Sequence, residues 1–366
     1  MSNNTLLEYK CPCCSGAITF DSTLQKLVCP YCNTEFEVDA VADFNEAENE
    51  SENQQEPIWD EYNEQSGSGD WQENEILNVY TCSSCAGEIV ADDTTAATLC
   101  PYCGSPVIVS GKLSGAFRPD FVIPFKVNKD YAKQAFAKFM KNKPLLPKDF
   151  KKRHTIDKIE GIYVPFWLYD CNTDSQMRYR ATRVTTWMDS RYRYTRTSHF
   201  LLTRAGNLAF ERVPADGSSK MDDTYMQAIE PFDYSEMVSF NMPYLAGYLA
   251  EKYDVDPKSA SGYVNERIKV STNSEFDKTT VGYTTVHPQS TSIRIINGKT
   301  NYALLPVWML NTKYEGKTYI FAMNGQTGKF VGELPIDKKR CFGWFGIIAG
   351  ATALVGTLIS LLAGLF

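Results

Sequence analysis

The sequence reads YKCPCCSGAITFDSTLQKLVCPYC over residues 9–32 and YTCSSCAGEIVADDTTAATLCPYC over residues 80–103. The second stretch repeats the first after 71 positions, counted from Cys11 to Cys82, without a gap. In each stretch, two Cys-x-x-Cys pairs enclose fourteen residues. The other shared positions are Tyr9, Gly16, Ile18, Asp21, Thr23, Pro30 and Tyr31, which recur as Tyr80, Gly87, Ile89, Asp92, Thr94, Pro101 and Tyr102. The chain therefore contains a duplicated module.

The duplicated cysteine pairs predict two structural zinc sites. Each Cys-x-x-Cys turn presents two thiolates, and two such turns at the ends of a short hairpin supply four sulfurs to one tetrahedral Zn²⁺. The predicted ligands are Cys11, Cys14, Cys29 and Cys32 in the first module and Cys82, Cys85, Cys100 and Cys103 in the second. Four protein ligands leave no coordination position for water, so we expect structural rather than catalytic ions. A redox-active pair or a set of disulfides fits matched doubles less well.

Three of the eleven cysteines lie outside this pattern. Cys13 lies inside the first turn and is an alternative ligand, although the register with the second module favours Cys11 and Cys14. Cys171 is expected to be a small buried apolar residue. Cys341 borders the apolar C-terminal segment, where a thiol is either palmitoylated or unmodified.

Length and charge predict several units. The net charge is −7, but residues 39–75 carry thirteen Asp or Glu and no Lys or Arg, so the rest sums to +6 (−7 plus 13). This composition predicts a flexible tether whose Ile58 and Trp59 either dock or stay idle. We expect zinc ribbon 1 over residues 1–38, an acidic disordered linker over 39–76, zinc ribbon 2 over 77–112, an α+β middle domain over 113–337 and a transmembrane helix over 342–366.

The last 25 residues, from Phe342 to Phe366, contain no charge. A helix of that length covers about 37 Å, enough to span a hydrocarbon core. Lys338, Lys339 and Arg340 stand immediately before it and predict that the upstream domains lie in the cytoplasm, with a single pass through the cytoplasmic membrane. Small residues at four-residue intervals, Gly346 and Gly350 among them, are compatible with self-association.

The middle domain shows helical and strand periods. Helices are predicted over 129–143, capped by Asn128, over 241–253, and from Pro257 onward. Strands are predicted over 177–186 and 192–203 around a turn at 188–190, and over 317–323 and 329–334 around a second turn. The phrases YVPFWL (163–168) and LLPVWM (304–309) are interpreted as equivalent strands of an internal repeat, with their tryptophans in the core. The fold class is thus α+β multidomain: two rubredoxin-like zinc ribbons, a β-rich mixed α+β middle domain and one C-terminal transmembrane helix.

Arginines alternate with tyrosines in the first predicted hairpin. A strand period of two places the two residue types on opposite faces. The arginines of this candidate surface are Arg178, Arg180, Arg183, Arg191, Arg193 and Arg196. Such a surface suits nucleic acid, anionic lipid headgroups or an acidic peptide, and a solvated polar face over a tyrosine-lined core is the simpler alternative.

No catalytic motif is recognisable. The three histidines are scattered, and no metalloprotease helix, phosphate-binding loop or nucleophile elbow occurs. The GQTGK run at 325–329 lacks full phosphate-loop spacing and falls in a predicted hairpin turn. We therefore expect no enzyme activity.

The duplicated cysteine boxes, each ending in CPYC, resemble those of bacterial double-zinc-ribbon membrane proteins, as do Pro165-Phe166-Trp167, residues 323–329 with 332–335, and the hydrophobic tail. Members of that group carry labels such as "transcription factor IIB-type zinc ribbon" or "primosomal/replication" protein. The resemblance implies partners similar to phage-shock protein A and to stomatin-like (SPFH or virion-core-like) proteins, and a role in envelope stress. Only the eight cysteines are carried over, and Cys13 departs from the common pattern.

Two functions fit the sequence. The preferred one is a non-enzymatic, membrane-anchored adaptor whose ribbons recruit cytosolic proteins. The alternative is a membrane-tethered nucleic-acid-binding protein. The ribbons are poorly basic, since Lys26 is the one cation between Cys14 and Cys29 and none lies between Cys85 and Cys100. Phosphate binding depends on such cations, so the adaptor is favoured.

Overall fold

A computed structural model describes residues 11, 14, 16–22, 24–38, 59, 77–91, 100–105, 107–112, 117–141, 143–147, 150, 159–220 and 223–363. The chain divides into two compact units. Unit 1 comprises residues 1–61, 169–213 and 261–300, and unit 2 comprises residues 62–168, 214–260 and 301–366. The boundary falls within three long strands, β8 (Glu160–Met188), β9 (Arg193–Asp216) and β12 (Thr285–Tyr314). The short predicted strands at 163–168, 177–186, 192–203 and 304–309 are parts of these.

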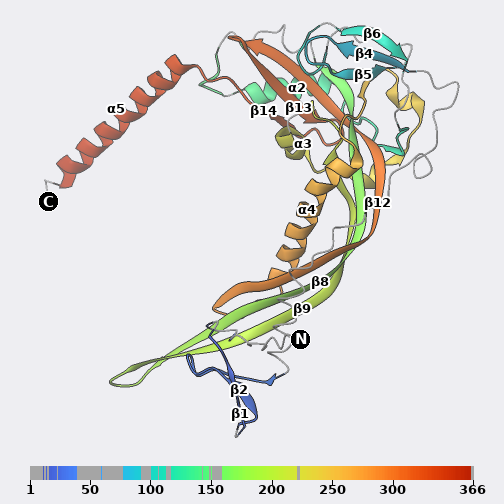
Figure 1. Ribbon diagram of the computed structural model, residues 1–366. Coiled ribbons are helices and arrows are strands. Elements are labelled where there is room, and N and C mark those ends of the chain that lie inside the picture. The colour runs from blue at the N-terminus through green and yellow to red at the C-terminus, as the bar shows by residue number, and fades with distance from the viewer. Residues whose placement is uncertain are drawn as a thin grey trace, which may run out of the picture. The chain divides into compact units, whose positions relative to one another are not determined.

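Unit 2 is built on a mixed sheet (Figure 1). Its strand order is β10-β7-β12-β8-β11-β5-β4-β6, and β13 and β14 extend it from β12. The shorter strands are β4 (Asn78–Cys82), β5 (Glu88–Ala91), β6 (Val107–Lys112), β7 (Phe121–Val122), β10 (Val238–Ser239), β11 (Leu249–Glu251), β13 (Lys317–Asn324) and β14 (Phe330–Gly332). The β13–β14 pairing matches the predicted second hairpin. Aliphatic and aromatic side chains of β8 and β12 fill the centre of the core.

The two tryptophan phrases are structurally equivalent, as predicted. Both Trp167 on β8 and Trp308 on β12 are buried. The indole N–H of Trp167 donates to the carbonyl of Val255, and that of Trp308 donates to the carbonyl of Val127, both at 2.8 Å. The two rings therefore hold equivalent loops against the sheet and serve the core.

The repeat extends to the strands and helices that precede and follow those loops. β11 runs parallel to β8, with Ala250 opposite Tyr163, and β7 runs parallel to β12, with Val122 opposite Leu304. A helix follows each short strand: α4 (Pro257–Asp277) follows β11, and α2 (Lys129–Met140) follows β7. In this correspondence Glu251 of β11 takes the place of the buried Ile123.

Two of the three predicted helices are confirmed. Asn128 caps α2 by accepting a hydrogen bond from the N–H of Tyr131 at 2.9 Å, and α4 begins at Pro257. The predicted helix over 241–253 is wrong. Pro243 supports only a 3₁₀ turn at Met242–Leu245, Gly247 then adopts a φ of +81°, and the chain continues as β11. Pairing of β11 on both edges outweighs the local helical pattern.

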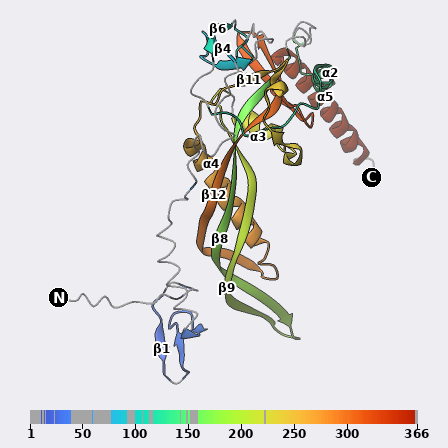
Figure 2. The ribbon, with the colours of Figure 1, turned by 90° about the vertical axis from the view of Figure 1, so that its right-hand side faces the viewer.

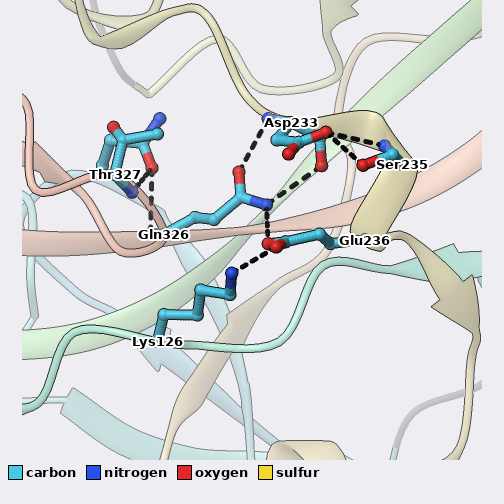
Figure 3. Close-up of polar contacts among 7 residues, drawn as sticks. Lys126, Asp233, Ser235, Glu236, Gln326 and Thr327 are labelled. Atoms are coloured by element: carbon cyan, nitrogen blue, oxygen red, sulfur yellow. Dashed lines mark hydrogen bonds and ion pairs between the residues drawn. The ribbon is translucent and has the colours of Figure 1, made fainter.

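The turn between β13 and β14 fastens a neighbouring segment (Figure 3). The side-chain amide of Gln326 accepts a hydrogen bond from the N–H of Asp233 at 2.8 Å and donates to Glu236 at 2.6 Å, and Lys126 pairs with the same carboxylate. The buried Asn324 donates to the carbonyl of Ile229, which ends α3 (Asp223–Ile229). The amides of Gln326 and Asn324 therefore make structural hydrogen bonds that hold the β13–β14 turn against residues 229–236.

In unit 1, the hairpin of β8 and β9 and the first half of β12 carry α4 on one face (Figures 1 and 2). Their small core contains Met177, Tyr179, Ala181, Leu202, Phe276 and Ile293. Beyond this core the β8–β9 hairpin continues past the start of β12, as both views show.

Ribbon 1 forms its own three-stranded sheet, and ribbon 2 does not. β1 (Thr19–Asp21), β2 (Lys26–Val28) and β3 (Glu35–Phe36) pair in the order β1-β2-β3. The strands of ribbon 2 instead join the large sheet, because β5 pairs antiparallel with β11, with Val90 opposite Ala250. The structure thus gives a mixed α+β protein with a large sheet and two four-cysteine groups.

The chain closes with α5 (Lys338–Ala363). Its stretch Lys338–Thr357 is long and apolar enough to cross a membrane, and none of that window is buried. This is the one such helix within the described residues.

Candidate metal centres

The eight predicted cysteines assemble into two groups of four. In each group the four sulfurs lie within 4.8 Å of one another. The closest sulfur pairs are 3.5 to 3.6 Å apart in both ribbons. A tetrahedral Zn²⁺ with bonds of about 2.3 Å places its sulfurs about 3.8 Å apart. The donor sets therefore have the size and chemistry of tetrahedral thiolate sites.

Short backbone hydrogen bonds shape each cysteine turn. The N–H of Cys82 donates to the carbonyl of Gly87 at 3.0 Å, and the N–H of Ala86 donates to the carbonyl of Cys82 at 2.8 Å. The residue directly after the second cysteine adopts a positive φ in three of the turns: Asn33 (52°), Ala86 (54°) and Gly104 (70°). The left-handed residue reverses the chain, so both thiols of a pair point to the same centre.

The two recurring glycines of the repeat lie against a tyrosine ring, and at Gly16 a side chain would clash with it. A Cβ on Gly16 would lie 2.5 Å from the ring of Tyr31, and a Cβ on Gly87 would lie 3.4 Å from the ring of Tyr102. Each glycine faces the tyrosine of the second cysteine turn, and Gly87 directly follows Ala86, the residue at the reversal. The Gly and Tyr recurrences in the sequence therefore describe one contact made twice.

A hydroxyl residue supports the last thiol of each ribbon. Burial by itself raises the pKa of Cys32, but hydrogen bonds from the hydroxyl and amide of Thr34 lower it to about 6. The same opposition of burial and hydrogen bonds from Ser105 leaves the pKa of Cys103 at about 6. A thiol that ionises readily is a ready metal ligand.

The two groups differ in their surroundings. Tyr102 of ribbon 2 is 5% exposed and packs in the core of unit 2, whereas the equivalent Tyr31 of ribbon 1 is 75% exposed. Other exposed apolar side chains of ribbon 1 are Phe20, Leu24 and Val38. The same module is thus packed into the core of unit 2 in ribbon 2, whereas in ribbon 1 its apolar side chains are exposed.

A buried carboxyl group, that of Glu251, lies on β11, the strand that pairs with β5 of ribbon 2. Glu251 accepts a hydrogen bond from the hydroxyl of Ser218 at 2.5 Å, and its second oxygen makes none. Burial raises its pKa to about 7, against the opposing effects of Ser218 and Tyr102. Sequence reasoning missed this residue, since one acidic position in the chain carries no signal until it is aligned with Ile123 of the repeat.

The six predicted arginines do not form one surface. Arg178 is buried, Arg180 is half-buried, and the others are exposed. The guanidinium of Arg183 covers the rings of Phe200 and Tyr283, at 5.3 and 5.2 Å from their centres. The remaining three, Arg191, Arg193 and Arg196, lie at the end of the hairpin.

The cations that precede the apolar segment lie in the first turn of α5. Lys338 and Lys339 are exposed, while Arg340 donates to the carbonyls of Leu146 (2.8 Å) and Pro144 (3.3 Å). Arg340 therefore ties the start of the helix to unit 2.

The structure describes two of the three remaining cysteines and one residue of the acidic segment. Cys171 is buried, as predicted, Cys341 is exposed, and Cys13 lies outside the described residues. Within the acidic segment, Trp59 docks inside unit 1: its ring meets Tyr169 edge-on at 5.0 Å and its N–H donates to Asn265 at 3.0 Å. Ile58 and the rest of the segment lie outside the described residues.

Comparison with known proteins gives one close relationship. No protein-family model and no solved structure matches the chain. An uncharacterized protein of Bacillus subtilis (strain 168), YdjG, is 39% identical over 359 residues, which cover 98% of this chain and 99% of YdjG. Identity at that level over the full length of both proteins places the chain in the same family as YdjG, and it belongs to that family.

Proposed function

We propose that the protein is a non-enzymatic, membrane-anchored zinc-ribbon adaptor. The observation that supports this most is the contrast between the ribbons. Ribbon 2 buries Tyr102 within its own chain, whereas ribbon 1 keeps Tyr31, Phe20 and Leu24 exposed. A module with a metal site, its own sheet and an exposed apolar surface suits the binding of another protein.

In this proposal both metals are structural Zn²⁺. Four thiols per site, with no fifth protein donor among the described residues, favour a closed tetrahedral ion over a catalytic one. The ions hold the cysteine turns together and take no part in a reaction.

The anchor in this proposal is α5, as a single pass through the cytoplasmic membrane. Its apolar, unburied surface and the preceding cations Lys338 and Lys339 favour this placement, with both ribbons in the cytoplasm. The resemblance to double-zinc-ribbon membrane proteins names the first partners to test, which are phage-shock-A-like and SPFH-like proteins in an envelope-stress response.

The test compares partners captured by the full-length protein from crosslinked membranes. Wild type, Tyr31→Ala with Phe20→Ala, and a control with Tyr263→Ala and Val270→Ala on α4 are captured in parallel. Tyr263 and Val270 are also exposed, so the control likewise removes two exposed apolar side chains, away from ribbon 1. The adaptor proposal expects a partner that the wild type and the control retain and the ribbon 1 variant loses. Equal capture by all three proteins would reject it.

The alternative is nucleic-acid binding, and it is favoured by the arginines at the hairpin end, which pair with no acid among the described residues. Binding through phosphates weakens steeply with salt. Salt-sensitive binding of an oligonucleotide by the detergent-solubilised full chain, lost when Arg191, Arg193 and Arg196 are replaced by glutamate, would support this function. An absence of binding at low salt would remove it.

A further inference from the structure

The β8–β9 hairpin extends past the start of β12 in unit 1 (Figures 1 and 2). The N–H of Val184 on β8 donates to the hydroxyl of Thr284 at 2.9 Å, and Thr284 directly precedes the start of β12. Beyond this point residues 185–196 form a two-stranded projection (Figures 1 and 2). Two strands without a third strand or a helix bury little surface and are marginal in water. We call residues 185–196 the hairpin tip.

Exposed apolar side chains occur on both faces of the hairpin tip, with Trp187 and the tyrosines on one face and Met188 beside Arg193 on the other. Trp187 is 49% exposed and Met188 is 68% exposed, and neighbours along a strand point to opposite faces. In the turn, Tyr192 is 63% exposed. Trp187 and Tyr194 stack on each other at 5.6 Å with their planes 15° apart, so each has one ring face already covered. Nothing in the described part of unit 1 buries these groups.

The charge of the hairpin tip is positive and not neutralised by ion pairs. It carries Arg191, Arg193 and Arg196 and a single acidic residue, Asp189. Asp189 accepts hydrogen bonds from the N–H groups of Arg191 (2.8 Å) and Tyr192 (2.7 Å) and from the hydroxyl of Tyr194 (2.9 Å), which also lower its pKa. This carboxylate shapes the turn. Among the described residues, none of the three guanidinium groups pairs with it or with any other acid.

We propose that the hairpin tip is a second membrane contact, which inserts its apolar end into the bilayer interface and binds anionic phospholipid headgroups through Arg191, Arg193 and Arg196. Apolar residues on both faces suit a medium that surrounds the tip, whereas a protein groove or a nucleic acid would contact one face. Trp and Tyr favour the interface, and arginines beside them meet phosphates.

The inference rests on the proposed anchor only for its proximity to a bilayer, and the test separates the two. The full chain is reconstituted into nanodiscs of phosphatidylcholine alone or with about one third phosphatidylglycerol, and phosphatidylcholine discs are also mixed with anionic vesicles. Hydrogen–deuterium exchange is followed in peptides from the hairpin tip and from α5. Protection of α5 in every disc reports the anchor, and protection of the tip reports the contact proposed here.

Anionic lipid should slow exchange in the hairpin tip, and raised salt should reverse this. Each arginine near an anionic surface contributes about 1 kcal/mol, so replacing the three by glutamate should weaken tip binding by at least about a hundredfold and abolish the protection. The control, Lys138→Glu with Lys141→Glu and Lys299→Glu, changes the net charge equally at exposed positions outside the tip and should retain it. Trp187→Ala with Met188→Ala should weaken protection without changing its salt dependence.

Three outcomes would overturn the proposal. The first is unchanged exchange of the tip in both anionic arrangements while α5 is protected. The second is equal protection in the arginine variant and the lysine control. The third is protection of the tip by an oligonucleotide in neutral discs without any effect of anionic lipid, which would assign the surface to nucleic acid.

Discussion

The two ribbons provide a matched pair for testing how a metal site contributes to stability. Cys29 and Cys100 are equivalent positions of the repeat, and both are buried. Replacing either by serine removes one thiolate from one site, so each variant should lose one of two metal ions. The chemistry of the change is the same in both variants, and the surroundings of the two ribbons differ.

The expected effects on unit 2 differ strongly. Ribbon 2 contributes Tyr80, Ile89, Val90 and Tyr102 to the buried interior, all less than 9% exposed. At about 1.5–3 kcal/mol for each buried side chain, disordering ribbon 2 removes about 6–12 kcal/mol from unit 2. A domain is stable by about 5–15 kcal/mol in total, so Cys100→Ser should unfold or severely destabilise unit 2. Cys29→Ser should leave unit 2 unchanged, because ribbon 1 forms a separate sheet.

The assay is hydrogen–deuterium exchange of the detergent-solubilised full chain, with metal content measured by mass spectrometry on the same samples. The reporter peptides contain residues 162–168 of β8 and 303–309 of β12, which are buried in unit 2. A loss of only about 3 kcal/mol already accelerates exchange by about a hundredfold. Equal exchange in the two variants, each with one metal ion left, would refute the conclusion that ribbon 2 is part of the core of unit 2.

Three further predictions concern single side chains. The pKa of Glu251 is raised from 4.5 to about 7, so ionised Glu251 destabilises the folded state increasingly as pH rises through that interval. Glu251→Gln should therefore be more stable than wild type by up to about 3 kcal/mol at pH 8 and no more stable at pH 4. Urea unfolding at both pH values measures this difference. Trp59→Ala should accelerate proteolysis within residues 39–76 without changing the unfolding of unit 2. The control Trp187→Ala should leave the rate of proteolysis within residues 39–76 unchanged. Asn324→Ala should destabilise unit 2 by about 3 kcal/mol in urea unfolding, because it leaves buried partners, the carbonyl of Ile229 among them, without hydrogen bonds.

The two four-cysteine groups could be predicted from sequence because their determinants are local. Four ligands with fixed spacing define each site, and the recurring Gly16 and Tyr31 already record a contact within one module. The place of ribbon 2 in the large sheet could not be predicted in this way. It depends on the pairing of Val90 with Ala250, and nothing near Val90 in the sequence specifies that partner.

Periodicity located the strands but did not determine where the core of unit 1 ends. Tyr179 is buried and Tyr194 is 41% exposed, although both alternate with arginines. The core ends where Arg183 covers Phe200 and Tyr283, and this arrangement needs the turn that precedes β12, about a hundred residues further along the chain. Exposure at the hairpin tip is therefore a tertiary property, which the strand period alone does not contain.

The docking of Trp59 changes the range over which ribbon 1 can act. A chain free between Val38 and Leu77 would let ribbon 1 move up to about 130 Å from ribbon 2, at about 3.4 Å per residue. With Trp59 held against Tyr169, the segment between Val38 and Trp59 limits ribbon 1 to about 70 Å from that contact. A shorter connection raises the effective concentration of any partner held near that contact. Trp59 thus fixes one point of the segment that joins the two ribbons, and Trp59→Ala would remove this limit without altering either four-cysteine group.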